Sequence, residues 1–246
     1  MVKHILFFCV FVWATTSVFA GENKLYSPDG KLCVTVSDEG GMPSYSVVYD
    51  GTVFLQKSPL GLNTNLGDYT RQMTLSRVGS LSSVNDKYHL LTIKNSRPQY
   101  QANVQTYTFS KEGKAIYDVV FHVGNHDVAF KYKVYPQDNI LCCIVKQEAT
   151  GFVLPKGSTT FLCPQSAPMG GFARTSPSYE TGYTVDDVLG KNGWGHGYTF
   201  PCLFKNEDKG WILISETGVS SAYCGSRLFG KEGGLYTIGF PQEGEY

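Results

Sequence analysis

Short runs in which apolar and polar residues alternate recur along most of the chain. In the first of them, Leu32, Val34 and Val36 alternate with more polar neighbours, which is the pattern of a strand with one buried face. No stretch places apolar residues at helical spacing over three turns with capping residues at its ends. The pattern therefore predicts an all-β chain. Further strands are predicted at 45–49, 53–55, 116–123, 128–135, 140–145, 159–162, 200–204 and 211–215.

Turn-forming residues separate these strands and predict three hairpins. Asp50-Gly51 is a strong two-residue hairpin turn, and the turns at 124–127 and 206–210 each join two predicted strands. Many short strands joined in this way predict one large antiparallel β-sandwich. The stretch 164–199, rich in Gly, Ser, Pro and Tyr, is instead a long excursion. Loops of that length in a compact domain are usually functional or disordered.

The first twenty residues have the pattern of a secretory signal. Lys3 and His4 precede an apolar run over 5–13, and small residues stand at the end of the segment, before a cleavage site at Ala20. The apolar run is too short to span a bilayer, and Gly21 excludes a lipoprotein, which needs a cysteine there. We therefore expect a signal peptide at 1–20, a soluble exported domain at 21–246, and a periplasmic or secreted location.

Composition excludes several classes of protein. The 21 Lys and Arg balance the 21 Asp and Glu, and no basic run occurs, so nucleic-acid binding is excluded. Six cysteines remain after the signal, and they are interpreted either as mostly small buried residues or as forming at least one disulfide. Cys142 and Cys143, neighbours in a predicted strand, face opposite sides and cannot easily pair with each other.

Catalytic and metal-binding motifs are absent: there is no G-x-S-x-G, H-E-x-x-H, P-loop or calcium loop. His122 and His126 have an i, i+4 spacing that would suit a metal on a helix, but they fall on a strand end and its turn and do not share a helical face, so they are interpreted as ordinary surface or packing histidines. In Gly193-Trp194-Gly195-His196-Gly197, the glycines let Trp194 and His196 project, and a Trp face can stack on a sugar. The alternative is a plain surface turn. Glu180, beside Tyr179, is by itself a solvated acid.

Several blocks, spread over nearly the whole chain, resemble one known family. The ordered series resembles the N-terminal domain of glycoside hydrolase family 97, which comprises bacterial retaining or inverting α-glycosidases of the α-glucosidase and α-galactosidase type. The resemblance covers residues 25 to 240. The blocks are Ser27 to Gly30, Leu32 to Val36, Tyr45 to Val47, Tyr49 to Gly51, Ser58 to Leu62, Asn125 to Tyr132, Tyr179-Glu180, Leu203 to Lys205, Gly210 to Gly218 and Gly225 to Leu228.

The resemblance implies a galactose-mutarotase-like sandwich that packs against a (β/α)₈ barrel. That barrel carries the catalytic carboxylates and takes about 250 residues. The sequence stops at Tyr246, so we expect no catalytic residue in this chain, which is either a fragment or a natural truncation. The expected role is that of an accessory carbohydrate-binding domain of an α-glycosidase, with the barrel and an α-glucoside or α-galactoside as partners. His126-Asp127 replaces the usual Asp-Gly of its hairpin, which implies a different turn.

Two other functions remain open at this point. One is a stand-alone carbohydrate-binding or structural module. The other is a small mutarotase-like enzyme, which needs a histidine acid facing a carboxylate base, although His89, His122, His126 and His196 lie in no motif for it.

The resemblance also implies calcium in the full-length enzyme, to which the N-terminal domain contributes one glutamate. Glu180 is the match and Glu216 is the rival. One carboxylate cannot make a tight calcium site, since calcium takes six to eight oxygens. We therefore expect the isolated chain to bind calcium weakly or not at all. Trp194 and His196 are the candidate substrate-binding residues.

Overall fold

The computed structural model describes residues 23–92, 94, 96–137, 140, 142–166, 182–221 and 223–241. Strands dominate these ranges, and the described helices are single 3₁₀ turns at Glu39–Gly41 and Glu232–Gly234. All described strand pairs are antiparallel. The all-β prediction is therefore confirmed. No helix in the described part of the chain is long and apolar enough to cross a membrane.

The first sheet is a meander in the order β1-β2-β3-β4. Its Asp50-Gly51 turn is confirmed: both residues have positive φ, 47° and 76°, which a two-residue hairpin turn of type I′ requires. The register between β3 and β4 shifts twice, between Tyr45 and Val47 and again before Val48, so β4 carries extra residues and bends. The strands are β1 Asn23–Tyr26, β2 Leu32–Ser37, β3 Ser44–Tyr49 and β4 Thr52–Pro59.

The second sheet has the order β11-β10-β9-β7, and β8 also pairs with β9. Aromatic side chains cover its inner face. Phe121 lies 5.0 Å from Phe130 and 5.8 Å from Tyr45 of the first sheet, measured between ring centroids. The strands are β7 Thr74–Val78, β8 Ser82–Lys87, β9 Gln99–Lys111, β10 Lys114–Gly124 and β11 Val128–Val134.

A small third sheet, in the order β12-β5-β6, corrects one sequence prediction. No strand spans 140–145: in the described part, Ile140 and Cys142 to Ile144 are outside strands, and β12 begins at Val145. Ile140 and Ile144 are 48% and 58% exposed, so this apolar run is not a buried face. The strands are β5 Leu62–Thr64, β6 Gly67–Tyr69 and β12 Val145–Glu148.

The fourth sheet has the order β13-β19-β18-β16-β14-β15, and β17 pairs with β16. The predicted strands at 159–162, 200–204 and 211–215 lie here, somewhat lengthened or shifted, as β14, β16 and β17. The strands are β13 Gly151–Val153, β14 Thr159–Pro164, β15 Asp187–Val188, β16 Tyr198–Asn206, β17 Gly210–Ile214, β18 Arg227–Gly230 and β19 Leu235–Gly239.

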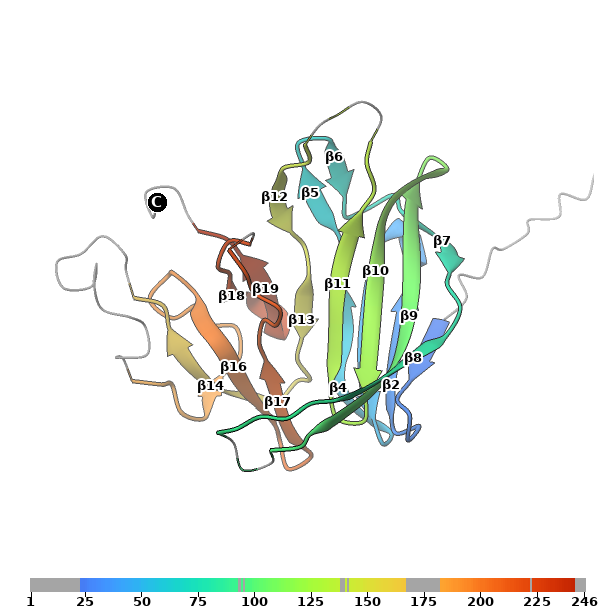
Figure 1. Ribbon diagram of the computed structural model, residues 1–246. Helices are drawn as coiled ribbons and strands as arrows, with labels where there is room; N and C mark the ends of the chain where they lie inside the picture. Colours follow the sequence, from blue (N-terminus) through green and yellow to red (C-terminus); the bar gives the residue numbers. More distant parts are fainter. Residues whose placement is uncertain are drawn as a thin grey trace, which may run out of the picture.

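One cluster of buried side chains joins the sheets. It contains Tyr45 of the first sheet, Phe121 of the second, Leu62 of the third and Phe204 of the fourth, all at most 4% exposed. In Figure 1, β9, β10 and β11 lie in front of β2 and β4, while β14, β16 and β17 form the other side of the molecule. The strands β13 and β19 lie between these two parts. The result is the large antiparallel sandwich that the sequence predicts.

The cysteines correct a second expectation. All six after residue 20 are free, but Cys163 and Cys202 alone are buried. Cys142, Cys143 and Cys224 are exposed, and Cys33 is half-buried. Both interpretations are therefore wrong for this structure, because most of the six cysteines are not buried and none forms a disulfide. Cys142 and Cys143 are exposed because they lie in the segment before β12, which is outside the strands and outside the core.

Candidate functional site

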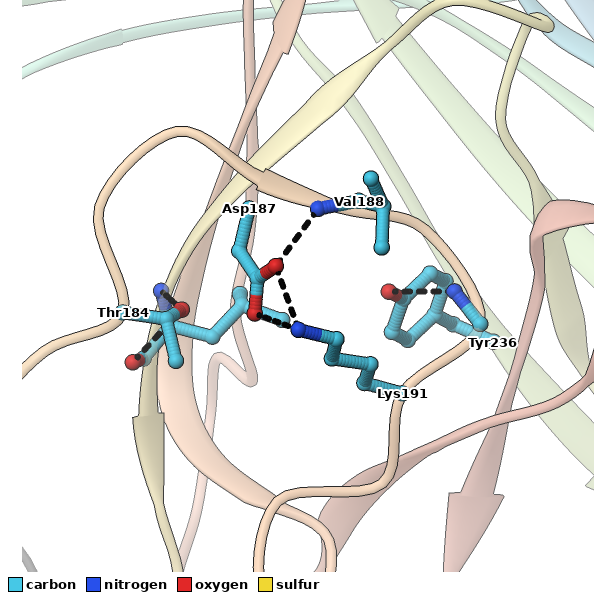
Figure 2. Close-up of polar contacts among 7 residues, drawn as sticks. Thr184, Asp187, Val188, Lys191 and Tyr236 are labelled. Atoms are coloured by element: carbon cyan, nitrogen blue, oxygen red, sulfur yellow. Dashed lines mark hydrogen bonds and ion pairs between the residues drawn. The ribbon is translucent and has the colours of Figure 1, made fainter.

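The candidate site is the segment 182–197, which leads into β16. Thr184 fastens its start to β14: its N–H donates to the Leu162 carbonyl at 2.8 Å, and its hydroxyl accepts the Leu162 N–H at 3.0 Å (Figure 2). After two further residues comes β15, in which Asp187 lies opposite Thr160 and Val188 opposite Thr159. The segment therefore begins as an edge strand of the fourth sheet.

A short polar network then turns the chain back. The Lys191 ammonium donates to both carboxylate oxygens of Asp187, at 2.6 and 2.9 Å, and the Val188 N–H donates to the same carboxylate at 2.8 Å (Figure 2). The hydrogen bond from Lys191, followed by that from the backbone, holds the pKa of the Asp187 carboxyl below its usual value despite partial desolvation. The Gly190 N–H donates to the Tyr236 hydroxyl at 3.2 Å. Because Tyr236 is fully buried in β19, this bond ties the turn to the core.

Glycines shape the turn that carries Trp194 and His196. Gly193, Gly195 and Gly197 all have positive φ, and the N–H groups of the latter two donate to the Asn192 carbonyl. At Gly197 the requirement is strict, because a Cβ atom would lie 2.6 Å from the Leu228 carbonyl oxygen. This turn therefore has a defined backbone that packs against β18.

The structure brings the two predicted sugar-contact residues into this one turn. Trp194 is 60% exposed, and His196 is half-buried. The Trp194 indole is therefore accessible to a ligand. Glu180 and Tyr179 lie outside the described residues.

Glu216, the rival to Glu180, follows β17 and is exposed. Its carboxylate accepts a hydrogen bond from the Ser226 hydroxyl. It also lies close enough to Glu148 to contribute to raising the pKa of that carboxyl. Among the described residues, no group of three or more His, Cys, Asp or Glu side chains could hold a metal ion. The described carboxylates thus do not complete a calcium site by themselves.

Sequence reasoning missed a partly buried polar cluster around Glu148. Burial is the main cause that raises the pKa of the Glu148 carboxyl, and a hydrogen bond with Thr150 opposes it. The Tyr132 hydroxyl accepts the Gly61 N–H at 2.9 Å and lies 2.8 Å from the Thr150 hydroxyl oxygen. These residues come from distant parts of the sequence, so no local pattern could have grouped them.

His122 and His126 lie at one end of the hairpin formed by β10 and β11. His122 lies in β10, where burial lowers the pKa of its imidazole. His126 lies in the turn after β10, with Nδ1 3.4 Å from the Tyr49 hydroxyl. Neither ring hydrogen-bonds a carboxylate within the described ranges. As predicted, His122 lies on a strand and His126 in the turn that follows it.

The described residues thus form a large all-β antiparallel sandwich, with a glycine-rich turn packed against β18 inside its fourth sheet. The model of the family described as Glycosyl-hydrolase 97 N-terminal matches residues 25–242. The chain belongs to this family, as its resemblance predicts.

Relatives with solved structures share the fold. A β-arabinopyranosidase is 44% identical, with a TM-score of 0.85 over 91% of this chain and 36% of its own. A glycoside hydrolase family 97 enzyme from Pseudoalteromonas sp. strain K8, in complex with panose, is 22% identical, with a TM-score of 0.75 over 89% of this chain and 32% of its own. The latter likeness concerns the fold alone.

A curated relative matches this chain over a similar share of its own length. A probable retaining α-galactosidase of Streptomyces bingchenggensis (strain BCW-1) is 26% identical over 231 residues, which are 93% of this chain and 33% of that protein. The chain thus spans about a third of the length of the relatives it matches.

Proposed function

We propose that this chain is the accessory N-terminal sandwich of an exported α-glycosidase, and that it supports an active site whose catalytic carboxylates lie outside this sequence. The observation that carries the proposal is the family match over residues 25–242 in a chain that spans a third of its relatives. Glycoside hydrolysis of this kind uses two carboxylates placed on either side of the scissile bond. A (β/α)₈ barrel is the part that would supply them.

The names of the relatives favour one sugar configuration. In the L series, a β-arabinopyranoside has the ring configuration of an α-D-galactoside and differs from it by lacking the hydroxymethyl group. One site shape thus suits both a β-arabinopyranosidase and an α-galactosidase. We infer that the whole enzyme acts on galactose-configured pyranosides, with α-glucosides as the alternative.

Activity of the isolated chain tests the accessory role. Residues 21–246, expressed alone, should give a strand-rich circular dichroism spectrum and no hydrolysis of aryl α-galactosides, β-L-arabinopyranosides or α-glucosides. Turnover by a preparation free of contaminating glycosidases would contradict the proposal. Sequencing of the gene beyond the codon for Tyr246 is the companion measurement. A reading frame with strand–helix alternation supports the role, and an immediate stop codon favours a stand-alone binding module.

Within this role, Trp194 and His196 are the proposed sugar contacts. The exposed Trp194 indole offers an apolar face for a sugar ring, and the turn is fixed by its glycines and by the network around Asp187. In the full-length enzyme, Trp194→Ala should raise KM about tenfold with little change in kcat. The matched control is Trp211→Ala on β17, also exposed, which should leave KM unchanged. Equal effects of both variants on KM would show that Trp194 is not a specific sugar contact.

For calcium, the proposed ligand is Glu180, with oxygen ligands from the barrel completing the coordination. Glu180→Gln in the full-length enzyme should weaken calcium binding in a titration and lower turnover while the sandwich stays folded. Glu216→Gln is the paired variant. If Glu216→Gln abolishes calcium binding and Glu180→Gln does not, the assignment moves to Glu216, whose carboxylate already accepts the Ser226 hydroxyl.

A further inference from the structure

A hollow of about 380 Å³ lies on the outer face of the first sheet, far along the chain from the Trp194 turn. Strand alternation places it there: Val34, Val36 and Val47 point into the core, while Thr35, Ser46 and Val48 point outward. A flat sheet face has no such hollow. The first register shift between β3 and β4 puts Gln56 and Lys57 opposite the single residue Ser46, the second inserts Phe54 between two pairs, and together they bend β4.

The floor and the rim of the hollow differ in chemistry. Val48 and Val53, which are cross-strand partners on the outer face, contribute apolar surface. Thr35 and Ser46 are cross-strand partners that contribute a pair of hydroxyl groups, and Gln56 contributes a carboxamide. Within the described chain, these three polar side chains make no hydrogen bond. They are therefore available to a ligand.

The charges at the rim cancel each other. Lys57 donates to the Glu39 carboxylate at 2.6 Å, and this hydrogen bond is the main cause that holds the pKa of Glu39 below its usual value. Glu39 and Lys57 are the charged side chains among the described lining residues. An anion could pair with Lys57 only by breaking the Lys57–Glu39 ion pair, and a cation could pair with Glu39 only by breaking the same ion pair. The lining thus favours an uncharged ligand.

An apolar floor, free hydroxyl and amide groups and a neutral rim match the two sides of a pyranose, which has an apolar C–H face and a polar edge. The volume lies within the roughly 300–1,000 Å³ of small-molecule sites. We propose that this hollow is a second, non-catalytic binding site for one or two rings of a neutral sugar. It does not depend on the Trp194 turn or on the accessory role in a glycosidase.

Amide chemical shifts of the mature chain, residues 21–246, test the proposal. The titrants are D-galactose, L-arabinose and panose, with glycerol as a small polyol that lacks a ring. The sugars should shift the amides of Thr35, Ser46, Val48 and Gln56 with a Kd in the millimolar range, because a few neutral hydrogen bonds give modest net affinity.

Matched variants connect the shifts to the side chains. Thr35→Val combined with Ser46→Ala removes both hydroxyls and should raise Kd about tenfold or more. Thr52→Val is the control, since Thr52 lies on β4 outside the hollow. It should leave Kd unchanged, and thermal unfolding should show all three proteins folded.

Three results would each overturn the proposal. One is the absence of shifts at the highest soluble sugar concentration. Another is a set of shifts confined to residues 190–198, which would report the Trp194 turn alone. The third is an equal response to glycerol, which would show a crevice for any polyol. Because glycosidase activity is not measured, the accessory role can fail without affecting this result.

Discussion

The Tyr132 hydroxyl joins three segments that are distant in sequence. It accepts the Gly61 N–H, lies 2.8 Å from the Thr150 hydroxyl oxygen, and belongs to a side chain that packs in the aromatic core beside Tyr117. Tyr132→Phe keeps the ring but leaves the Gly61 N–H without its partner. We expect a loss of about 1–3 kcal/mol in the free energy of unfolding, measured by urea denaturation. A loss near zero would mean that water replaces the hydroxyl.

Gly197 is fixed by both its backbone and its surroundings. Its φ is 81°, and an added Cβ would meet the Leu228 carbonyl oxygen at 2.6 Å. Gly197→Ala should therefore displace the Trp194 turn and shift the Trp fluorescence, with a destabilisation above the roughly 1 kcal/mol of φ strain alone. Gly195→Ala is the matched control, because Gly195 has φ 96° but nothing within 4 Å of its Cβ position. Equal losses would show that the contact with Leu228 is unimportant.

Glu148 makes the stability of the fold depend on pH. Burial raises the pKa of its carboxyl, with a smaller contribution from Glu216, so the folded state binds the proton more readily than the unfolded state does. Such a group stabilises the fold below its unfolded pKa, and this contribution is lost as the pH rises through the folded pKa. Glu148→Gln should thus raise Tm relative to the wild type at pH 7.

The control for this prediction is the same comparison in acid. Below about pH 4 both proteins carry a neutral side chain at this position, so the difference in Tm should vanish. A difference that persists unchanged from pH 7 to pH 4 would assign the effect to packing and not to ionisation.

At the scale of elements, alternation of apolar and polar residues predicts strands well where one face is buried and the other is exposed to solvent. The strand at Leu32–Ser37, the Asp50-Gly51 hairpin and the strand pair around 124–127 follow directly from it. The strand β8, Ser82–Lys87, has little apolar content and forms because β9 offers it an edge. Pairing of this kind is a tertiary effect that no local pattern records.

The candidate site was predictable only in part. The glycines around Trp194 and His196 are visible in the sequence, and the turn that they imply is present. The hydrogen bonds that hold the turn in place cannot be read from the sequence, because they join residues that are far apart. Thr184 and Leu162 are 22 residues apart, and Gly190 and Tyr236 are 46 residues apart. The hollow on the first sheet depends on register shifts, which the sequence does not reveal either.

The Asp187–Lys191 pair is expected to order its loop more than it stabilises the domain. The Lys191 side chain is 56% exposed, and exposed ion pairs contribute at most about 1 kcal/mol. Asp187→Asn should therefore leave the global free energy of unfolding nearly unchanged while hydrogen exchange speeds up at Val188 to Lys191. The exchange rates at Phe204 and Tyr236 serve as the internal reference. Equal acceleration there would show that the pair stabilises the whole sheet.

On the scale of the whole molecule, the outer face of the fourth sheet carries an apolar strip. Val188, Trp211 and Leu213 are 53–64% exposed, and the ring centroids of Trp211 and Phe161 lie 5.1 Å apart. Exposed apolar side chains on one sheet face favour self-association, even though Thr159 and Lys205 separate Val188 from Trp211 across the sheet. Leu213→Lys should lower light scattering of a concentrated solution of residues 21–246 without changing Tm. Thr52→Lys on the first sheet controls for added charge, and an equal improvement there would point to net charge alone.

The position of β19 has a consequence for how the protein is made. Its five residues, Leu235–Gly239, lie between β13 and β18, although β13 leaves the ribosome more than eighty residues earlier. The fourth sheet cannot be completed during synthesis until β19 has left the ribosome and paired with β13 and β18. Until then β13 and β18 present open edges to other chains, which is a hazard for nascent proteins with long-range strand pairing. A ribosome that stalls before residue 235 would thus release a product with an incomplete sheet, one that chaperones and proteases would recognise.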